Sequence, residues 1–149
     1  MYPEIMVIPM REELTRLGIE ELRSAADVDR FVANEPGASP STKMVVVNSI
    51  CGCAAGRMRP AVRLALQNAV KPGKIATVFA GQDTEATARA RAHFAGYPPS
   101  SPSIAILRDG KVIYMMHRHQ IETREAAAIS ADLKAAFDQH CATPAEAHK

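Results

Sequence analysis

The chain has 149 residues, of which 47% are hydrophobic and 23% are charged, and its formal net charge is +2. This length suits one globular domain with a single hydrophobic core. The charge is too small and too evenly spread to indicate nucleic acid or an anionic membrane as a partner. No apolar run is long enough to cross a bilayer, and the first residues lack the pattern of a secretory signal, so we expect a cytoplasmic protein.

Cysteine is the unusual part of the composition. The chain has three cysteines, and two of them lie one residue apart in Cys51-Gly52-Cys53. A chain of this length does not need disulfides to stabilise its core. A close pair in a reducing compartment therefore indicates redox chemistry or metal binding, although two ordinary buried cysteines are the plainer alternative.

Residues 1–42 are predicted to form a helical extension followed by a loop. Apolar residues at helical spacing predict a first helix that stops at Gly18. Ser24 is suited to cap a second helix, with Asp27 three residues later as its reciprocal partner. Residues 35–42 are rich in proline, glycine and serine, which predicts a loop.

An α/β pattern begins at residue 43. The apolar run at residues 44–47 predicts a strand buried on both faces. A helix is predicted over residues 54–70, with a kink at Pro60. Residues 75–80 predict a second strand, which a helical crossover places parallel to the first.

Two more strands are predicted in the second half of the chain. A proline-rich approach leads into a strand at residues 103–107, and Asp109-Gly110 predicts a tight hairpin to a fourth strand at residues 111–117. The hairpin makes this last pair antiparallel. The sequence therefore predicts an α/β fold with a central mixed four-stranded sheet flanked by helices.

Polar residues predict where the remaining helices begin. Asp83 is suited to cap the helix after the second strand, and Thr123 the last helix. Residues 142–149 predict a frayed tail. We expect one domain over residues 1–149, with a core at residues 43–141.

Cys51 is predicted to be the more reactive thiol because it lies where a strand passes into a helix. Backbone N–H groups and the helix dipole lower a thiol pKa at such a junction, and Arg57 and Arg59 add positive charge. A disulfide to Cys53 requires Cys51 to lie outside the regular helix, with Gly52 easing the turn. We expect such a small ring to be strained and therefore oxidising.

Long stretches of the sequence resemble a known family. The segments VVVNSICGCAAG, TVFAGQDTEATA and PPSSPSIA are similar to the bacilliredoxins. The strand, CGC, helix and proline arrangement, together with SPSIAIL and RDGKV, resembles the thioredoxin fold. The resemblance covers nearly the whole chain and implies a thioredoxin-like three-layer fold with a Cys-Gly-Cys redox site.

The resemblance also implies an activity and its partners. Cys51 would attack and Cys53 would resolve, in a thiol–disulfide oxidoreductase that removes bacillithiol from mixed disulfides on client proteins and has weak isomerase activity. No cofactor is implied beyond the redox-active disulfide and bacillithiol, or a similar small thiol, as co-substrate. The oligomeric state is left open.

Substrate contacts are implied at the same end of the fold. Pro102 matches the cis-proline that faces the cysteines in thioredoxin-like proteins, so Ser101 and Pro102, beside Gly52, would flank the incoming disulfide. Arginines bind carboxylates bidentately, and one or more of four could hold the carboxylates of bacillithiol. These four are Arg57, Arg59, Arg63 and Arg118.

Two positions depart from the thioredoxin pattern. Ile50 and Val45 stand where thioredoxins carry a tryptophan and a buried aspartate, so no carboxylate base is evident for the resolving thiol. Asn48 and Ser49 are the remaining candidates to assist it through hydrogen bonds.

Two other hypotheses remain. A zinc-type site could combine Cys51 and Cys53 with His117 and His119, which share a face if both lie on a strand; however, Cys-x-Cys is not a usual zinc spacing. A redox-sensing adaptor would switch partners when Cys51 is oxidised. Cys141 is interpreted as a partly exposed helix-end cysteine whose pKa is raised, with an intermolecular disulfide or a later resolving role as alternatives.

Overall fold

The computed structural model describes residues 1–33 and 41–142. Its helices are α1 (Glu4–Thr15), α2 (Ala25–Val32), α3 (Arg59–Ala65), α4 (Thr84–Ala92), α5 (Arg118–Glu122) and α6 (Ala126–His140), with a π-helical segment, η1 (Ala54–Met58), directly before α3. Its strands are β1 (Glu20–Glu21), β2 (Thr42–Asn48), β3 (Lys74–Phe79), β4 (Ser103–Arg108) and β5 (Lys111–Met116). Most of the loop predicted at residues 35–42, and of the tail predicted at 142–149, lies outside the described residues.

The strands form one mixed sheet in the order β1-β3-β2-β4-β5. β3 runs parallel to β1 and β2, while β4 runs antiparallel to β2 and β5. The prediction of four strands is wrong, because Glu20–Glu21 adds a short fifth strand at the edge beside β3. Two adjacent glutamates carry no strand pattern, and only their neighbour in space makes them one.

The β4–β5 hairpin turns as predicted. Asp109 and Gly110 both have positive φ, of 53° and 77°. This backbone conformation gives a tight two-residue turn whose twist matches that of the flanking strands.

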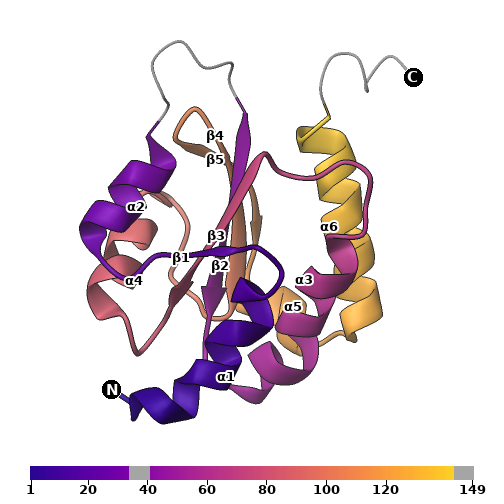
Figure 1. The fold of residues 1–149 in the computed structure, drawn as a ribbon. Helices are drawn as coiled ribbons and strands as arrows, with labels where there is room; N and C mark the ends of the chain where they lie inside the picture. Colours follow the sequence, from indigo (N-terminus) through magenta and orange to yellow (C-terminus); the bar gives the residue numbers. More distant parts are fainter. Residues whose placement is uncertain (34–40, 143–149) are drawn as a thin grey trace.

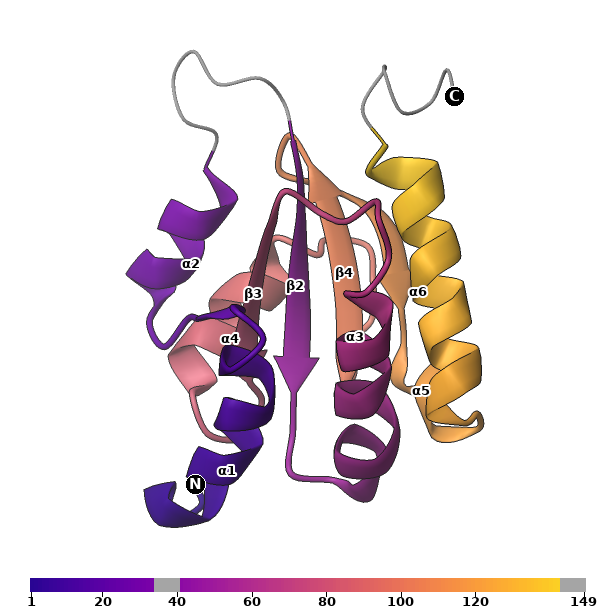
Figure 2. The same cartoon turned by 45° about the vertical axis from the view of Figure 1, so that its right-hand side comes forward.

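Helices cover both faces of the sheet, which confirms the three-layer prediction. Met44 and Val46 of β2 pack into one core cluster with α3 and α6, whereas Val45 and Val47 pack into the other with α2 and α4. The period-2 alternation of side chains along a strand explains this division. Figures 1 and 2 show α2 and α4 on one side of the sheet and α3 and α6 on the other.

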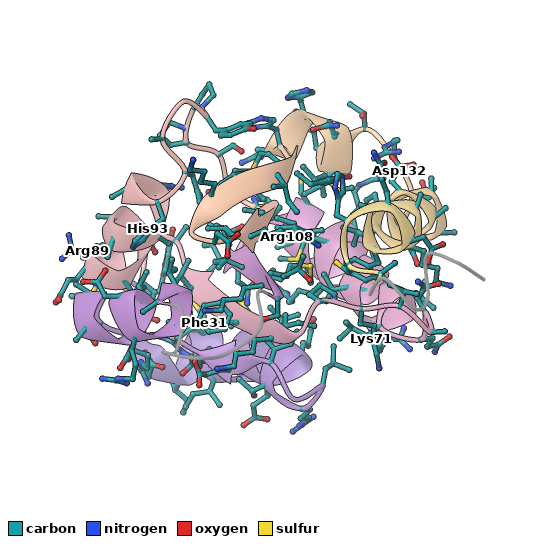
Figure 3. The ribbon with its side chains drawn as sticks, turned by 90° about the horizontal axis from the view of Figure 1, so that it is seen from above. Phe31, Lys71, Arg89, His93, Arg108 and Asp132 are labelled. Carbon is teal, nitrogen blue, oxygen red and sulfur yellow. The ribbon has the colours of Figure 1, made fainter. Side chains whose placement is uncertain are left out.

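The α2–α4 layer is also joined by polar contacts on its outer surface. Asp29 of α2 accepts a hydrogen bond from Arg89 Nε of α4 at 3.1 Å, and His93 Nε2 lies 3.3 Å from the same carboxylate. Seen from above in Figure 3, Arg89 and His93 lie on this side of the sheet, and Asp132 of α6 lies on the opposite side. Within the part of the chain that the structure describes, no helix has the length and apolar character needed to cross a membrane.

The helix predicted over residues 54–70 differs from the observed one. The observed helix ends at Ala65, and its first part is the π-helical segment η1. Pro60 is the second residue of α3, where its missing N–H does not interrupt a regular ladder. The predicted kink is therefore replaced by a change of helix type just before the proline.

Ser24 caps α2 as predicted, since its hydroxyl accepts a hydrogen bond from the Asp27 N–H at 3.1 Å. The Asp27 carboxylate accepts from the Arg23 N–H at 3.1 Å rather than from Ser24. The predicted cap therefore forms, but the Asp27 carboxylate binds the N–H of Arg23, one residue before Ser24.

The caps predicted at Thr123 and Asp83 are wrong. Thr123 follows the short helix α5 and its hydroxyl donates to the His119 carbonyl at 2.9 Å, while α6 begins after Glu125. The Asp83 side chain makes no cap hydrogen bond to α4, because a distant arginine binds it instead.

That arginine is Arg11, which attaches the N-terminal helix to the sheet. Its guanidinium contacts both Asp83 oxygens, at 2.6 and 3.0 Å, and the side chain is only 6% exposed. Glu4 and Glu21 also contact it, and the guanidinium stacks over the Phe79 ring. Because Arg11 of α1 pairs with Asp83, which lies 72 residues later in the sequence, α1 is an integral part of the fold.

We expect Arg11→Met to lower the free energy of unfolding by about 3 kcal/mol, because it leaves the Asp83 carboxylate buried with weaker compensation. Urea denaturation checks this value. The matched control is Arg16→Met on the same helix, where the arginine side chain is 76% exposed and pairs with Glu12. Equal losses in the two variants would contradict a buried ion network.

Candidate active site

The site begins where the chain leaves β2. The Asn48 side-chain oxygen accepts from the Ser49 N–H at 2.9 Å and from Arg59 Nη1 at 3.0 Å. Its nitrogen donates to the Met10 carbonyl of α1 at 3.2 Å. Asn48 is buried, and buried backbone groups need hydrogen-bond partners. Its side chain supplies these partners to the Ser49 N–H and the Met10 carbonyl, where the strand has ended.

Arg59 holds the same turn from the helix side. It is 3% exposed, and it donates to the Ser49 carbonyl at 3.0 Å and to Glu13 of α1 at 2.5 Å. Its charge is therefore committed to the scaffold. These contacts favour a positioning role for Arg59. The predicted contact of Arg59 with substrate stays a prediction.

Cys51 lies just outside the helix, as the geometry of the pair requires. The N–H groups of Ala54 and Ala55 donate to its carbonyl at 3.0 and 3.2 Å, which starts the helical turn after it. The Ser49 hydroxyl donates to Cys51 Sγ at 3.1 Å, and the Cys51 N–H lies 3.3 Å from the same hydroxyl. Cys51 and Cys53 are free thiols of intermediate exposure.

These contacts stabilise a thiolate at Cys51. Partial burial raises the pKa of Cys51, but hydrogen bonds from the Ser49 hydroxyl, the N–H groups of Ala54 and Cys53, and the Cys53 thiol outweigh it and lower that pKa below its usual value. A lowered pKa increases the thiolate fraction at neutral pH, and the thiolate is the nucleophile. The predicted acidity is thus supported, but the side chains that lower the pKa of Cys51 are Ser49 and Cys53 rather than Arg57 and Arg59.

Gly52 does not relieve strain in the thiol form. Its φ lies outside the left-handed region that favours glycine, and a Cβ built on it would meet no atom within 4 Å. The space beside Gly52 is therefore open. The contribution predicted for Gly52 concerns the turn of a Cys51–Cys53 disulfide, and it stays a prediction because both thiols are free here.

The Ser101–Pro102 peptide bond is cis, as the resemblance to the thioredoxin fold predicts. β2 pairs with β4 so that Val47 stands opposite Ser103. Continuing this antiparallel register brings Pro102 and Ser101 alongside the turn that leads to Cys51. Their contact with substrate stays a prediction.

Arg118 joins this proline segment to the cysteine pair. Its Nη1 donates to the Ser101 carbonyl at 3.2 Å, and its Nη2 lies 4.0 Å from Cys53 Sγ. In the sequence it was only one of four candidate arginines, because nothing local distinguishes a surface charge after a strand from one that faces a thiol. Arg57 instead donates to the Arg124 carbonyl at 2.5 Å, so its guanidinium is engaged by the turn before α6.

The four-ligand metal site is not assembled. His117 precedes α5 and His119 lies within it, so they do not share a strand as expected. Their rings stack at 5.7 Å. Within residues 1–33 and 41–142, no group of three or more His, Cys, Asp or Glu side chains is placed to hold a metal ion.

Cys141 lies at the opposite end of the sheet from Cys51. It follows α6 and its thiol contacts Thr42, the first residue of β2, whereas Cys51 follows the last. A seven-residue strand spans roughly 20 Å, which excludes Cys141 as a resolving thiol within one chain. Burial raises the pKa of Cys141, so the predicted direction is confirmed but its main cause is desolvation.

Comparison with known proteins identifies the family. Residues 2–141 match the family model described as disulphide isomerase. A bacilliredoxin of Koribacter versatilis is 60% identical over 147 residues, which cover 99% of both chains. The chain belongs to the bacilliredoxin family.

Other bacilliredoxins are similar over most of their length. One from Geobacillus kaustophilus is 50% identical over 88% of this chain and 87% of its own. One from Bacillus licheniformis is 47% identical over 94% of this chain and 95% of its own. A thiol–disulfide redox function follows from this membership, and the acidified Cys51 beside a second thiol suits it.

We expect Ser49→Ala to shift the pH profile of Cys51 alkylation to higher pH, because the substitution removes a hydrogen bond to the thiolate. A bond of this kind is worth about 1.5 kcal/mol, or roughly a tenfold lower rate at pH 7. The measurement uses a Cys53→Ser, Cys141→Ser background, in which Cys51 is the only thiol. Ser49→Thr should restore the profile; an identical profile for Ala and Thr would show that the hydroxyl does not act on Cys51.

Proposed function

We propose that the protein is a thiol–disulfide oxidoreductase in which Cys51 attacks mixed disulfides and Cys53 resolves the product. The observation that carries this proposal is the set of hydrogen bonds that lowers the pKa of a half-exposed Cys51 at a helix start. The Cys53 thiol hydrogen-bonds to it and is therefore within reach for a second exchange.

The proposed cycle has two exchanges. The Cys51 thiolate attacks a protein–S–S–R disulfide, so that the Cys51–S–S–R bond forms and the client leaves as a thiolate, which takes up a proton. Cys53, having lost its proton to solvent, then attacks Cys51 Sγ, forming the Cys51–Cys53 disulfide and releasing R–S⁻. Each step exchanges one disulfide for another, and an external thiol reductant returns the pair to two thiols.

Bacillithiol, or a similar small thiol, is the proposed R group, because the relatives are bacilliredoxins and the chain keeps a Cys-Gly-Cys pair. No cofactor is needed beyond the redox-active pair. Client proteins carrying mixed disulfides are the proposed partners. The family description also supports disulfide isomerisation, which uses the same attack by Cys51 on a protein disulfide.

Trapping tests this proposal. In a Cys141→Ser background, Cys53→Ser should accumulate mixed disulfides on Cys51 when incubated with a protein that carries a small-thiol adduct, because no resolving thiol remains. The matched Cys51→Ser variant should accumulate few. Non-reducing mass spectrometry of the intact protein provides the measurement.

The same experiment can contradict the assignment of roles. Adducts of equal yield on Cys51→Ser would make Cys53 the attacking thiol. Absence of adducts on both variants, with the fold intact by circular dichroism, would count against exchange activity.

A further inference from the structure

A cavity that the proposed cycle does not use lies beside the cysteine pair. It has a volume of about 370 Å³ and is lined by residues 98–100 and by His117, Arg118, His119 and Glu122. We call it the Arg118 cavity. Its size falls within the range of small-molecule sites, at the smaller end. Figure 2 shows α5, which provides three of these residues, at the same end of the molecule as the start of α3.

Arg118 connects the cavity to the reacting sulfur atoms. Its Nη2 lies 4.0 Å from Cys53 Sγ, and its charge interacts with both Cys51 and Cys53. Its backbone N–H and Nη1 contact Ser100 Oγ and the Ser101 carbonyl, at 3.3 and 3.2 Å, which joins the cavity wall to the cis-proline segment. Arg118 therefore lies between this cavity and Cys53, whose thiol hydrogen-bonds to Cys51.

The polar groups that line the cavity suit an anion. The positive guanidinium of Arg118 pairs with the Glu122 carboxylate, at 2.9 Å from Nε. This is an exposed i,i+4 pair, which is weak and can exchange. Three contacts use three of the five guanidinium N–H groups, so two remain for a ligand.

Two histidines also line the cavity. The Gln120 N–H donates to the His117 carbonyl at 3.0 Å. The His117 ring stacks on His119 at 5.7 Å and lies 6.1 Å from the Tyr97 ring. The two rings are nearly parallel, at 9°, and both residues line the cavity together with Arg118. The cavity thus combines an apolar wall, which includes Pro98 and Pro99, with the charged guanidinium of Arg118.

We infer that the Arg118 cavity binds the carboxylate-bearing body of the small thiol while its sulfur is bonded to Cys51, and that Arg118 determines selectivity for acidic over neutral or basic thiols. This inference rests on the proposed function. Arginine suits the role because its planar fork binds a carboxylate bidentately. Cys51 then supplies the bond exchange, and Arg118 supplies the recognition.

The test compares two disulfides of opposite charge. The Cys53→Ser, Cys141→Ser protein is mixed with glutathione disulfide, which carries carboxylates, or with cystamine, which is cationic. Adduct formation on Cys51 is followed by intact mass. The rate ratio between the two reagents cancels any change in the reactivity of Cys51 itself.

We expect Arg118→Gln to lower the rate with glutathione disulfide roughly tenfold relative to that with cystamine. The matched control is Arg16→Gln, which removes the arginine of another i,i+4 pair, Glu12–Arg16, on α1. Glu122→Gln should shift the ratio the other way, because it removes the competing carboxylate.

A second readout separates binding in the cavity from a general charge effect. S-methylglutathione, which cannot exchange, should shift the NMR resonances of the His117 and His119 rings in the Arg118 protein and not in Arg118→Gln. Equal rate ratios in Arg118→Gln and Arg16→Gln, or unshifted histidines, would overturn the inference and leave the proposed function standing. Failure of Cys51 to react with either disulfide would instead overturn the proposed function.

Discussion

The site depends on one buried charge. Arg59 donates to Glu13 of α1, to the Asn48 side chain at the end of β2, and to the Ser49 carbonyl in the turn that follows. A buried guanidinium needs all of its partners, because an unpaired charge away from water is very costly. Three elements that are distant in sequence are therefore held together at one point. Ser49 lies two residues before Cys51 and donates to its sulfur. The contact of Arg59 with Glu13 of α1 therefore helps to position the hydroxyl that stabilises the thiolate.

Two arginines have different roles around the cysteine pair. Arg59 is 3% exposed and shapes the turn that directs the Ser49 hydroxyl at Cys51 Sγ. The side chain of Arg118 is 45% exposed and its charge faces the thiols from the cis-proline side. A hydroxyl, rather than a buried carboxylate, is thus the polar group next to the attacking sulfur. Such a group stabilises the thiolate without adding a negative charge that would oppose it.

Local patterns predicted the elements that local chemistry determines. The strand buried on both faces, the Asp109-Gly110 turn and the strand-to-helix position of Cys51 follow from short runs of residues. The functions of Asp83 and Arg59 could not be predicted in this way. Each has its charged partner about 50 to 70 residues away, and an acidic residue before a helix has the same local pattern whether it caps that helix or binds a distant arginine. β1 escaped prediction for the same reason, since pairing with β3 alone defines it.

The central claim is that the end of β2 makes Cys51 the most nucleophilic of the three thiols. Competitive alkylation tests it most directly: the fully reduced native chain is treated at pH 7 with less than one equivalent of iodoacetamide, and fragmentation mass spectrometry locates the label. The account predicts that Cys51 carries most of the label, with little on Cys53 and least on the half-buried Cys141, whose pKa is raised. Label found on Cys53 or Cys141 as readily as on Cys51 would contradict it.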